Sequence, residues 1–198
     1  MGALWLLDID EVLLEFMPEF IHFYNMRNLK RHGIIFVKED INTYDLWKVF
    51  GITEQEAVNE VQEFNKTINF RNLSACRGAI DFVNKIKGNC VAVTARTDST
   101  YEATKYNLDL RFGAGRIRVR FAKPYSLLTG GNHPLGKREI CLQEGARYAV
   151  EDSALHAINL AGVCEEVYLV NQPWNVGINE VNTYKNIIRI KSLDEIRV

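Results

Sequence analysis

Leu6-Leu7-Asp8-Ile9-Asp10 is the most informative stretch of this chain. An apolar run that ends in Asp-x-Asp predicts a buried strand that delivers Asp8 and Asp10 to its carboxyl end. Open parallel sheets bind their ligands at that edge. Because unpaired carboxylates are costly to bury, we expect a functional site around these two acids rather than a simple loop.

Three further pieces of sequence carry polar groups that the same topology would bring to this edge. A second apolar run ends in a hydroxyl, a third ends in a pair of carboxylates, and a lysine lies between them. Carboxylates, a hydroxyl and an ammonium that converge on one sheet edge can hold Mg²⁺ and a phosphate group. In chain order the pieces are Val93-Thr94-Ala95-Arg96, Lys137 and Val150-Glu151-Asp152-Ser153.

Strand and helix patterns alternate along most of the chain. Repeated alternation predicts a parallel sheet with helices on both faces, in the Rossmann-like α/β class. Capping boxes are expected at Ser99 with Glu102 and at Ser192 with Glu195, the second before a terminal helix. The predicted strands are 3–7, 90–94, 116–121, 148–151, 167–170 and 187–190, and the other predicted helices are 78–87, 101–108, 137–144 and 154–161.

Residues 16–73 break this alternation. Helices are expected over 16–29 and, after a capping box at Thr53 and Glu56, to about residue 65. The region is rich in aromatic residues, which at helical spacing usually pack inward as the core of a small bundle. We therefore expect a helical unit at 16–73 and a sheet domain formed by 1–15 and 74–198.

Bulk composition narrows the function classes. At 198 residues and 47% hydrophobic, the chain can bury one sizeable core. A net charge of −1 gives no overall attraction to nucleic acid or to an anionic membrane. No apolar stretch is long enough to span a bilayer, so we expect a cytoplasmic protein without a membrane partner. The cysteines are widely spaced, so we expect them to be reduced residues that pack in the core rather than members of a disulfide or zinc framework. They are Cys76, Cys90, Cys141 and Cys164.

The four pieces, in this order, resemble the motifs of the haloacid dehalogenase (HAD) superfamily of phosphohydrolases, and the resemblance covers most of the chain. It implies a helical cap inserted after the first strand. It also implies that Asp8 attacks phosphorus to form an aspartyl-phosphate. Asp10 would protonate the leaving oxygen and then deprotonate the hydrolytic water.

The resemblance also implies which groups hold the phosphate. The Thr94 hydroxyl and the N–H of Ala95 would bind a phosphoryl oxygen. The Arg96 guanidinium could bind the phosphate as well, or face solvent as an ordinary loop arginine. The lysine that neutralises the phosphate is expected to be Lys137, while Lys123, followed by proline, is the alternative that resembles the Lys-Pro form of some branches.

The metal would be Mg²⁺. Asp8 would bind it through its side chain, Asp10 through its backbone carbonyl and Asp152 directly, with Glu151 beside them. This last pair resembles the fourth motif of phosphoglucomutase-like members. Glu11 departs from the family, which usually has a small residue after the second aspartate, and this leaves the geometry of the turn open.

Two segments resemble the 5′-deoxyribonucleotidase branch. Residues 8–16 match its opening, and Phe16 stands where that branch has a phenylalanine that stacks on the substrate. Residues 171–175, Asn-Gln-Pro-Trp-Asn, are similar to its Pro-Trp-Asn or Pro-Tyr-Asn segment. We therefore expect a magnesium-dependent phosphomonoesterase that acts on a small phosphorylated substrate, most simply a nucleotide.

Two alternatives remain. The Thr-Ala-Arg of residues 94–96 looks more like the phosphatase domain of phage polynucleotide kinase-phosphatase, so the substrate could be a nucleic-acid 3′-end, or else a small metabolite. Arg116, Arg118 and Arg120 could follow a phosphate backbone, although charged residues that protect an edge strand explain them more simply. The second alternative is a binding protein that kept the fold and lost turnover, which the intact acids argue against.

Overall fold

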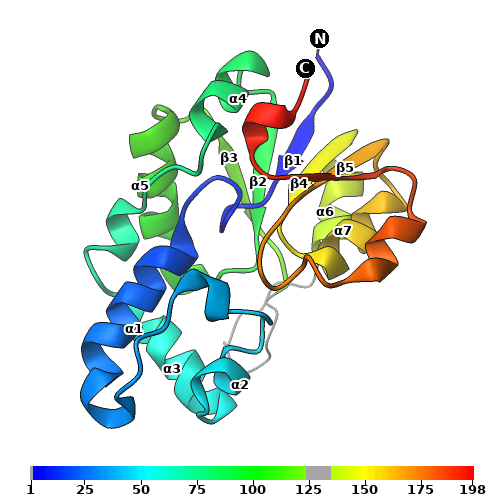
Figure 1. Cartoon of the computed structure of the whole chain (residues 1–198). Helices are drawn as coiled ribbons and strands as arrows, with labels where there is room; N and C mark the ends of the chain where they lie inside the picture. Colours follow the sequence, from blue (N-terminus) through cyan, green and yellow to red (C-terminus); the bar gives the residue numbers. More distant parts are fainter. Residues whose placement is uncertain (1, 124–134) are drawn as a thin grey trace.

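The computed structural model describes residues 2–123 and 135–198 of the chain (Figure 1). Its centre is a six-stranded sheet in the order β3-β2-β1-β4-β5-β6, and every neighbouring pair of strands is parallel. The strands are β1 (Trp5–Leu7), β2 (Cys90–Thr94), β3 (Arg118–Phe121), β4 (Tyr148–Glu151), β5 (Glu166–Val170) and β6 (Ile187–Ile190). The predicted Rossmann-like α/β class is confirmed.

Helices cover both faces of the sheet (Figure 1). Because side chains alternate along a strand, Leu6 faces the layer of α6 and α7, whereas Trp5 and Leu7 face the layer of α4 and α5. Both layers are closely packed, and their apolar residues form the two halves of the core. The helices are α4 (Ala79–Lys85), α5 (Tyr101–Phe112), α6 (Lys137–Glu144) and α7 (Ala154–Ala161).

Between β1 and α4 the chain forms α1 (Phe16–His32), α2 (Leu46–Phe50) and α3 (Glu54–Phe64), with short 3₁₀ turns at Lys38–Asp40 and Phe70–Asn72. The predicted capping box before α3 is confirmed, because Thr53 Oγ1 accepts a hydrogen bond from Glu56 N and the Glu56 carboxylate accepts one from Thr53 N. The aromatic rings pack inward as expected, as in the stacked pair Tyr24 and Phe50 with ring centroids 3.9 Å apart.

The chain leaves the sheet and returns to it through two adjacent segments. Glu15 N donates to Ser74 O at 2.9 Å, and Cys76 N donates to Leu13 O at 3.0 Å. The segments before and after the helical residues therefore run side by side where the chain leaves and re-enters the sheet domain. The assignment of 1–15 and 74–198 to a core and of 16–73 to a cap stays a prediction.

Two predicted capping boxes are wrong. A 3₁₀ turn at Asp98–Thr100 precedes α5 and makes Thr100 its N-cap residue, and the Ser99 hydroxyl instead bonds that of Thr97. After β6 the structure has a 3₁₀ turn at Leu193–Glu195 instead of a helix. There Ser192, the N-cap residue, makes no side-chain capping hydrogen bond, and the Glu195 carboxylate accepts from Lys191 N.

Candidate active site

The strand register brings the first and fourth motifs together. Leu7 lies opposite Ala92 of β2 on one side and Val150 of β4 on the other. Asp8, the next residue, is buried, and its N–H donates to Val150 O at 3.0 Å. Asp8 therefore lies between the ends of β2 and β4, where Thr94 and Glu151 also end their strands.

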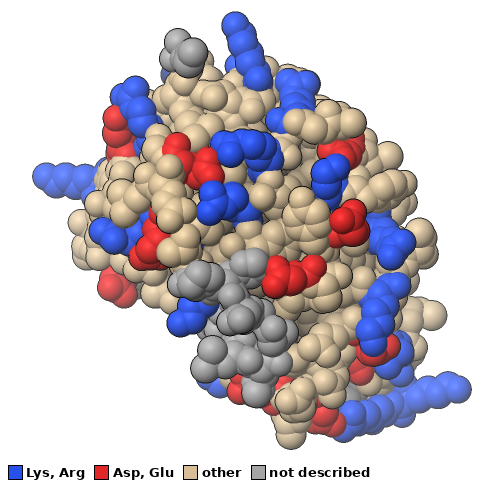
Figure 2. Space-filling model, turned by 180° about the vertical axis from the view of Figure 1, so that it is seen from behind, with Lys and Arg blue, Asp and Glu red and all other residues tan. Residues whose placement is uncertain are grey.

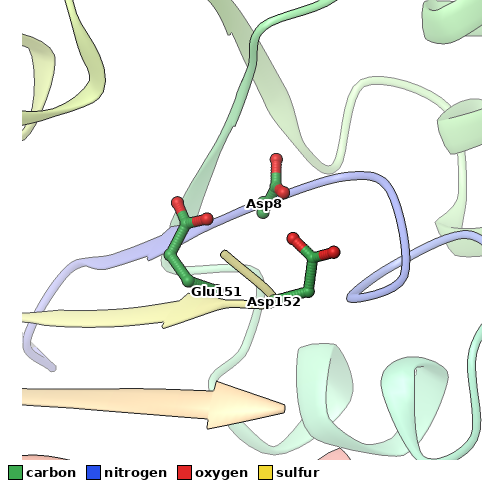
Figure 3. Close-up of side chains that lie close together, drawn as sticks. All are labelled: Asp8, Glu151 and Asp152. Atoms are coloured by element: carbon green, nitrogen blue, oxygen red, sulfur yellow. The ribbon is translucent and has the colours of Figure 1, made fainter. Parts of the chain in front are cut away.

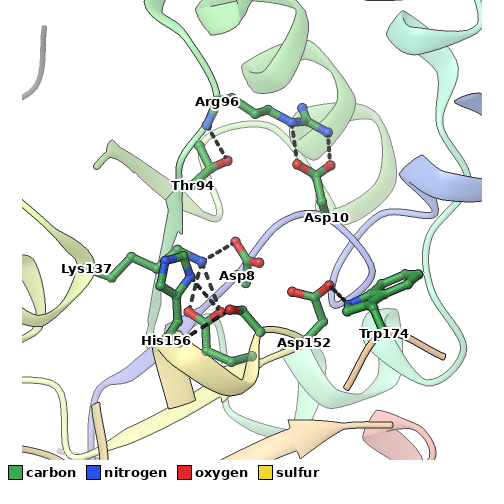
Figure 4. Close-up of polar contacts among 10 residues, drawn as sticks. Asp8, Asp10, Thr94, Arg96, Lys137, Asp152, His156 and Trp174 are labelled. Carbon is green, nitrogen blue, oxygen red and sulfur yellow. Dashed lines mark hydrogen bonds and ion pairs between the residues drawn. The ribbon is translucent and has the colours of Figure 1, made fainter. Parts of the chain in front are cut away.

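Lys137 links Asp8 to Glu151. It is the first residue of α6, and its Nζ lies 2.7 Å from Asp8 Oδ1 and 2.9 and 3.0 Å from the two carboxylate oxygens of Glu151 (Figure 4). Although burial opposes the charged form, the two carboxylates raise the pKa of Lys137 above its ordinary value. Lys123, by contrast, is exposed after the end of β3. Of the two candidate lysines, Lys137 is the one that the fold brings into the acid cluster.

Asp8, Glu151 and Asp152 form a compact acid cluster (Figure 3). Each is buried and offers a carboxylate oxygen, and these oxygens all lie within 4.8 Å of one another. Burial, opposed by Lys137 and reinforced by Glu151, raises the pKa of Asp8 to about 6. Burial and the charges of Asp8 and Glu151 raise the pKa of Asp152 well above its ordinary value.

The cluster contains three buried carboxylates, and Lys137 pairs with two of them and contributes a single ammonium, so negative charge is in excess. A divalent cation that prefers oxygen ligands would neutralise the excess, and carboxylates at this spacing are the ligands that Mg²⁺ takes in proteins. The donor set therefore fits the predicted metal. Within it, Asp8 and Asp152 are the acids whose carboxylate form burial disfavours most clearly.

Asp10 does not face the acid cluster. Its carboxylate points toward Arg96 and forms a bidentate pair, with Arg96 Nε 3.0 Å from Oδ2 and Nη2 2.5 Å from Oδ1 (Figure 4). Nη1 of the same guanidinium donates to Thr104 Oγ1 at 2.9 Å, and the group lies 4.7 Å from the centre of the Phe70 ring. Only 6% of the Arg96 side chain is exposed, so the solvent-facing alternative is wrong. Its contact with a phosphate stays a prediction.

Glu11 adopts the left-handed conformation that glycine favours, with φ at 59°. The turn is therefore of the kind that a small residue permits, and the strain is offset by contacts of the side chain. Its carboxylate accepts a hydrogen bond from Met17 N at 2.6 Å, in the first turn of α1, and pairs with the Lys38 ammonium. Glu11 thus ties the loop that carries Asp8 and Asp10 to the helical segment that follows.

A chamber of about 300 Å³ lies between this sheet edge and the helices of residues 16–73. Its floor is polar and includes Asp8, Thr94, Ala95 and Lys137, and its walls are mostly apolar. Phe16 is one of the wall residues, and its ring packs edge-on against Phe64 with centroids 5.3 Å apart. Leu46, Trp47, Val58 and Val61 also belong to the apolar wall.

Three residues near the acids were not predicted to act there. His156, in the first turn of α7, has Nδ1 3.7 Å from Glu151 Oε2. Trp174 donates its indole N–H to Asp152 Oδ2 at 3.1 Å, and the Tyr44 ring lies 5.7 Å from the Trp174 ring. The sequence contained one signal that could have predicted the position of Trp174. The Pro-Trp-Asn segment comes shortly after β5, and β5 is the neighbour of β4, the strand that ends in Glu151.

No protein-family model and no curated protein sequence matches this chain. Solved structures with similar folds include a HAD hydrolase of family IA, variant 3, from Entamoeba histolytica, at 14% identity and a TM-score of 0.61, covering 100% of this chain and 96% of that one. A HAD family hydrolase from Deinococcus radiodurans, solved with bound phosphate and sodium, has 16% identity, a TM-score of 0.65, and coverage of 98% and 93%. A haloacid dehalogenase-like hydrolase from Streptococcus pneumoniae has 14% identity, a TM-score of 0.65, and coverage of 97% and 95%.

These similarities extend over nearly the whole of each chain, so the protein has the fold of the HAD hydrolases. Among the residues that the structure describes, no helix combines the length and the apolar character needed to cross a membrane.

Proposed function

We propose that the protein is a magnesium-dependent phosphomonoesterase that works through an aspartyl-phosphate intermediate. The observation that carries the proposal is the position of Asp8, which ends the central strand beside two further buried acids and 2.7 Å from the Lys137 ammonium. A carboxylate held in this way can act as a nucleophile, because the ammonium reduces its repulsion of an incoming phosphate dianion.

In the proposed first step, an oxygen of Asp8 attacks phosphorus while the bond from phosphorus to the leaving oxygen breaks. Asp10 gives a proton to that oxygen. In the second step Asp10 accepts a proton from a water molecule whose oxygen attacks the phosphorus of the aspartyl-phosphate, which releases phosphate and restores Asp8. Thr94, Ala95 and Lys137 hold the phosphoryl oxygens. Bound Mg²⁺, held by Asp8, Asp10, Glu151 and Asp152, would supply positive charge for the phosphate and the acids.

Asp10 must leave Arg96 to reach the leaving oxygen. A phosphate is an anion with the same preference for a forked guanidinium, so substrate arriving on the floor of the chamber offers Arg96 a replacement partner. The bidentate pair seen here then describes the protein before substrate binds. Asp10 would be released for proton transfer only when a phosphate is in place.

We further propose that the substrate is a nucleotide and that the protein acts in the cytoplasm. The aromatic and aliphatic walls of the chamber suit a flat base above a phosphate. Arg118 and Arg120 both pair with Glu144, at 2.8 and 2.5 Å, which favours the charged edge strand over a track for nucleic acid. On the face shown in Figure 2, basic and acidic side chains are interspersed, which also disfavours a nucleic-acid partner.

The proposal that the protein acts in the cytoplasm rests on its cysteines, because buried, free thiols at Cys90 and Cys141 suit a reducing compartment.

The test is phosphate release from a simple aryl phosphate. We expect turnover with Mg²⁺, none in EDTA, and inhibition by Ca²⁺, a larger ion that takes more oxygen ligands and would compete for the attacking oxygen of Asp8. Absence of turnover despite Mg²⁺ binding would favour a binding protein of the same fold. Full activity in EDTA would remove the metal from the mechanism. A panel of mononucleotides and 3′-phosphorylated oligonucleotides then separates the two nucleotide-based alternatives.

Phe16→Ala is expected to raise KM for the best mononucleotide about tenfold or more, because stacking on a base is worth about 1–3 kcal/mol. Hydrolysis of a small phosphate without a base should barely change. Phe23→Ala is the matched control, since Phe23 is also a partly buried phenylalanine of α1 but packs on Phe64 away from the residues that line the chamber. Equal losses of Phe16→Ala on both substrates would make Phe16 a packing residue.

A further inference from the structure

The Pro173-Trp174-Asn175 segment makes contacts with Asp152 that the proposed catalytic steps do not use. The indole N–H of Trp174 donates to Asp152 Oδ2 at 3.1 Å (Figure 4), and Asn175 Nδ2 donates to the Asp152 backbone carbonyl at 2.7 Å. The side chain and the backbone of one acid are therefore both held by a segment that follows the neighbouring strand.

This segment is itself held firmly. Asn175 is fully buried, and its Nδ2 also donates to Val170 O at 2.8 Å at the end of β5. Its Oδ1 accepts from Gln172 N and from Arg189 Nη1, each at 3.2 Å. Because Asn175 makes several hydrogen bonds, the segment is rigid. It can therefore hold Asp152 in an orientation that burial and repulsion from the other acids oppose.

Asp152 needs such support. Its carboxylate is buried, and one of its oxygens lies within 4.8 Å of carboxylate oxygens of both Asp8 and Glu151, so the group sits among like charges. The indole N–H donates to one oxygen of Asp152 at 3.1 Å, which offsets part of this repulsion and fixes the rotation of the group. The second oxygen then faces the cluster in a defined direction. Partners of metal ligands commonly act in this way.

The helical segment contacts the same indole. Lys38 Nζ lies 5.7 Å from the centre of the Trp174 ring while it pairs with Glu11, and the Tyr44 ring lies 5.7 Å from that ring. Trp174 is only 4% exposed, so its ring is enclosed between residues 38–44 and the sheet domain. If residues 38–44 moved away, the Trp174 ring would lose its packing on one side.

We propose that Trp174 is a positioning residue that orients Asp152 for the divalent cation, and that residues 38–44 hold Trp174 in place. The inference rests on the proposed function, because it concerns the same metal site. The inference goes beyond the proposed function because it states that the packing of residues 38–44 affects the affinity of the site for Mg²⁺. Metal binding and docking of this segment then stabilise each other, since each favours the same position of Trp174.

The test is calorimetric titration of the purified full chain with Mg²⁺ in the absence of substrate. Trp174→Phe keeps an aromatic side chain, smaller than the indole, and removes the N–H, and we expect the Kd for Mg²⁺ to rise about tenfold or more. At saturating Mg²⁺, kcat should recover most of its wild-type value, because the variant keeps Asp8 and Asp10. Trp5→Phe is the control, since Trp5 is equally buried at 4% exposure and packs on Phe82 and Tyr148.

Lys38→Met removes the contact from the helical side without touching Asp152, but it also removes the cation of buried Glu11. Glu11→Gln breaks the same ion pair and keeps Lys38, so it is the control, and we expect Lys38→Met to raise the same Kd severalfold more than Glu11→Gln does. Unchanged Mg²⁺ affinity in Lys38→Met would overturn the role of residues 38–44. Wild-type affinity in Trp174→Phe, or an equal loss in Trp5→Phe, would overturn the role of the indole. If wild-type protein itself binds no Mg²⁺, the proposed function fails instead.

If Trp174→Phe does not fold, the proposal can be tested with a variant that keeps Trp174. The chain has three tryptophans, so Trp5→Phe with Trp47→Phe leaves Trp174 as the sole indole fluorophore. Mg²⁺ should then change its emission and saturate at the Kd measured by calorimetry. Emission that stays constant through a saturating titration would show that the metal does not alter the surroundings of Trp174, against the proposal.

Discussion

Asp8→Asn is expected to lower kcat at least about 10³-fold, equivalent to roughly 4 kcal/mol of activation free energy, while the protein stays folded. An amide is nearly the size of a carboxylate but cannot attack phosphorus. The change leaves Lys137 paired with Glu151 at 2.9 Å, so the cluster keeps a compensated charge. Phosphate release under saturating Mg²⁺ gives the rate, and circular dichroism reports the fold. A folded variant with more than a tenth of wild-type activity would refute the nucleophile assignment.

The same variant has a second expected result, in thermal unfolding in EDTA. Burial, opposed by Lys137, raises the pKa of Asp8 from 3.8 to about 6 in the folded protein. Ionised Asp8 therefore disfavours folding above pH 6, and this penalty disappears as the pH falls through 6 toward 4, where Asp8 is protonated in both states. Asp8→Asn should be more stable than the wild type at pH 7, with a difference that shrinks at low pH. A variant less stable at pH 7 would contradict the penalty.

Lys137→Ala is expected to lower kcat/KM at least about 10²–10³-fold, the usual cost of removing one charge that stabilises a transition state. The ammonium lies 2.7 Å from Asp8 and 2.9 Å from Glu151, and its loss leaves two buried carboxylates without their cation. The folded state should lose stability as well, because a broken buried ion pair typically costs about 3–5 kcal/mol. Thermal unfolding with and without Mg²⁺ separates this loss from the loss of rate.

Lys123→Ala is the matched control, because Lys123 is the other candidate lysine and is exposed. We expect kcat/KM within about twofold of the wild type. Should Lys123→Ala be inactive while Lys137→Ala turns over normally, the third motif would have been placed on the wrong lysine. Saturating phosphate should protect wild type and Lys123→Ala against unfolding but not Lys137→Ala, which checks binding without turnover.

The sequence alone was sufficient for the sheet and the acids at its edge, because those features depend on local patterns. Short apolar runs that end in a polar residue define strand ends such as Thr94 and Glu151. Glycine after Glu144 marks the end of α6, which matches the structure, as do the predicted bounds of α7. Parallel strands put their polar ends at one edge of the sheet, as predicted. The pairing of β1 with β4, which brings Asp8 beside Glu151, was decided by the strand order of the folded sheet.

The tertiary structure decided the partners of those side chains. Arg96 pairs with Asp10, Glu11 with Lys38, and Trp174 donates to Asp152, and in each pair the residues are far apart in the sequence. No local pattern specifies such pairs, because they depend on how the loop after β1, the helical segment and the turn after β5 pack against one another. One side chain in each pair is buried, namely that of Arg96, Glu11 or Asp152, so loss of the contact would leave a buried charge without its partner, which is costly. Burial is a property of the packed fold, and a single segment of sequence does not contain it.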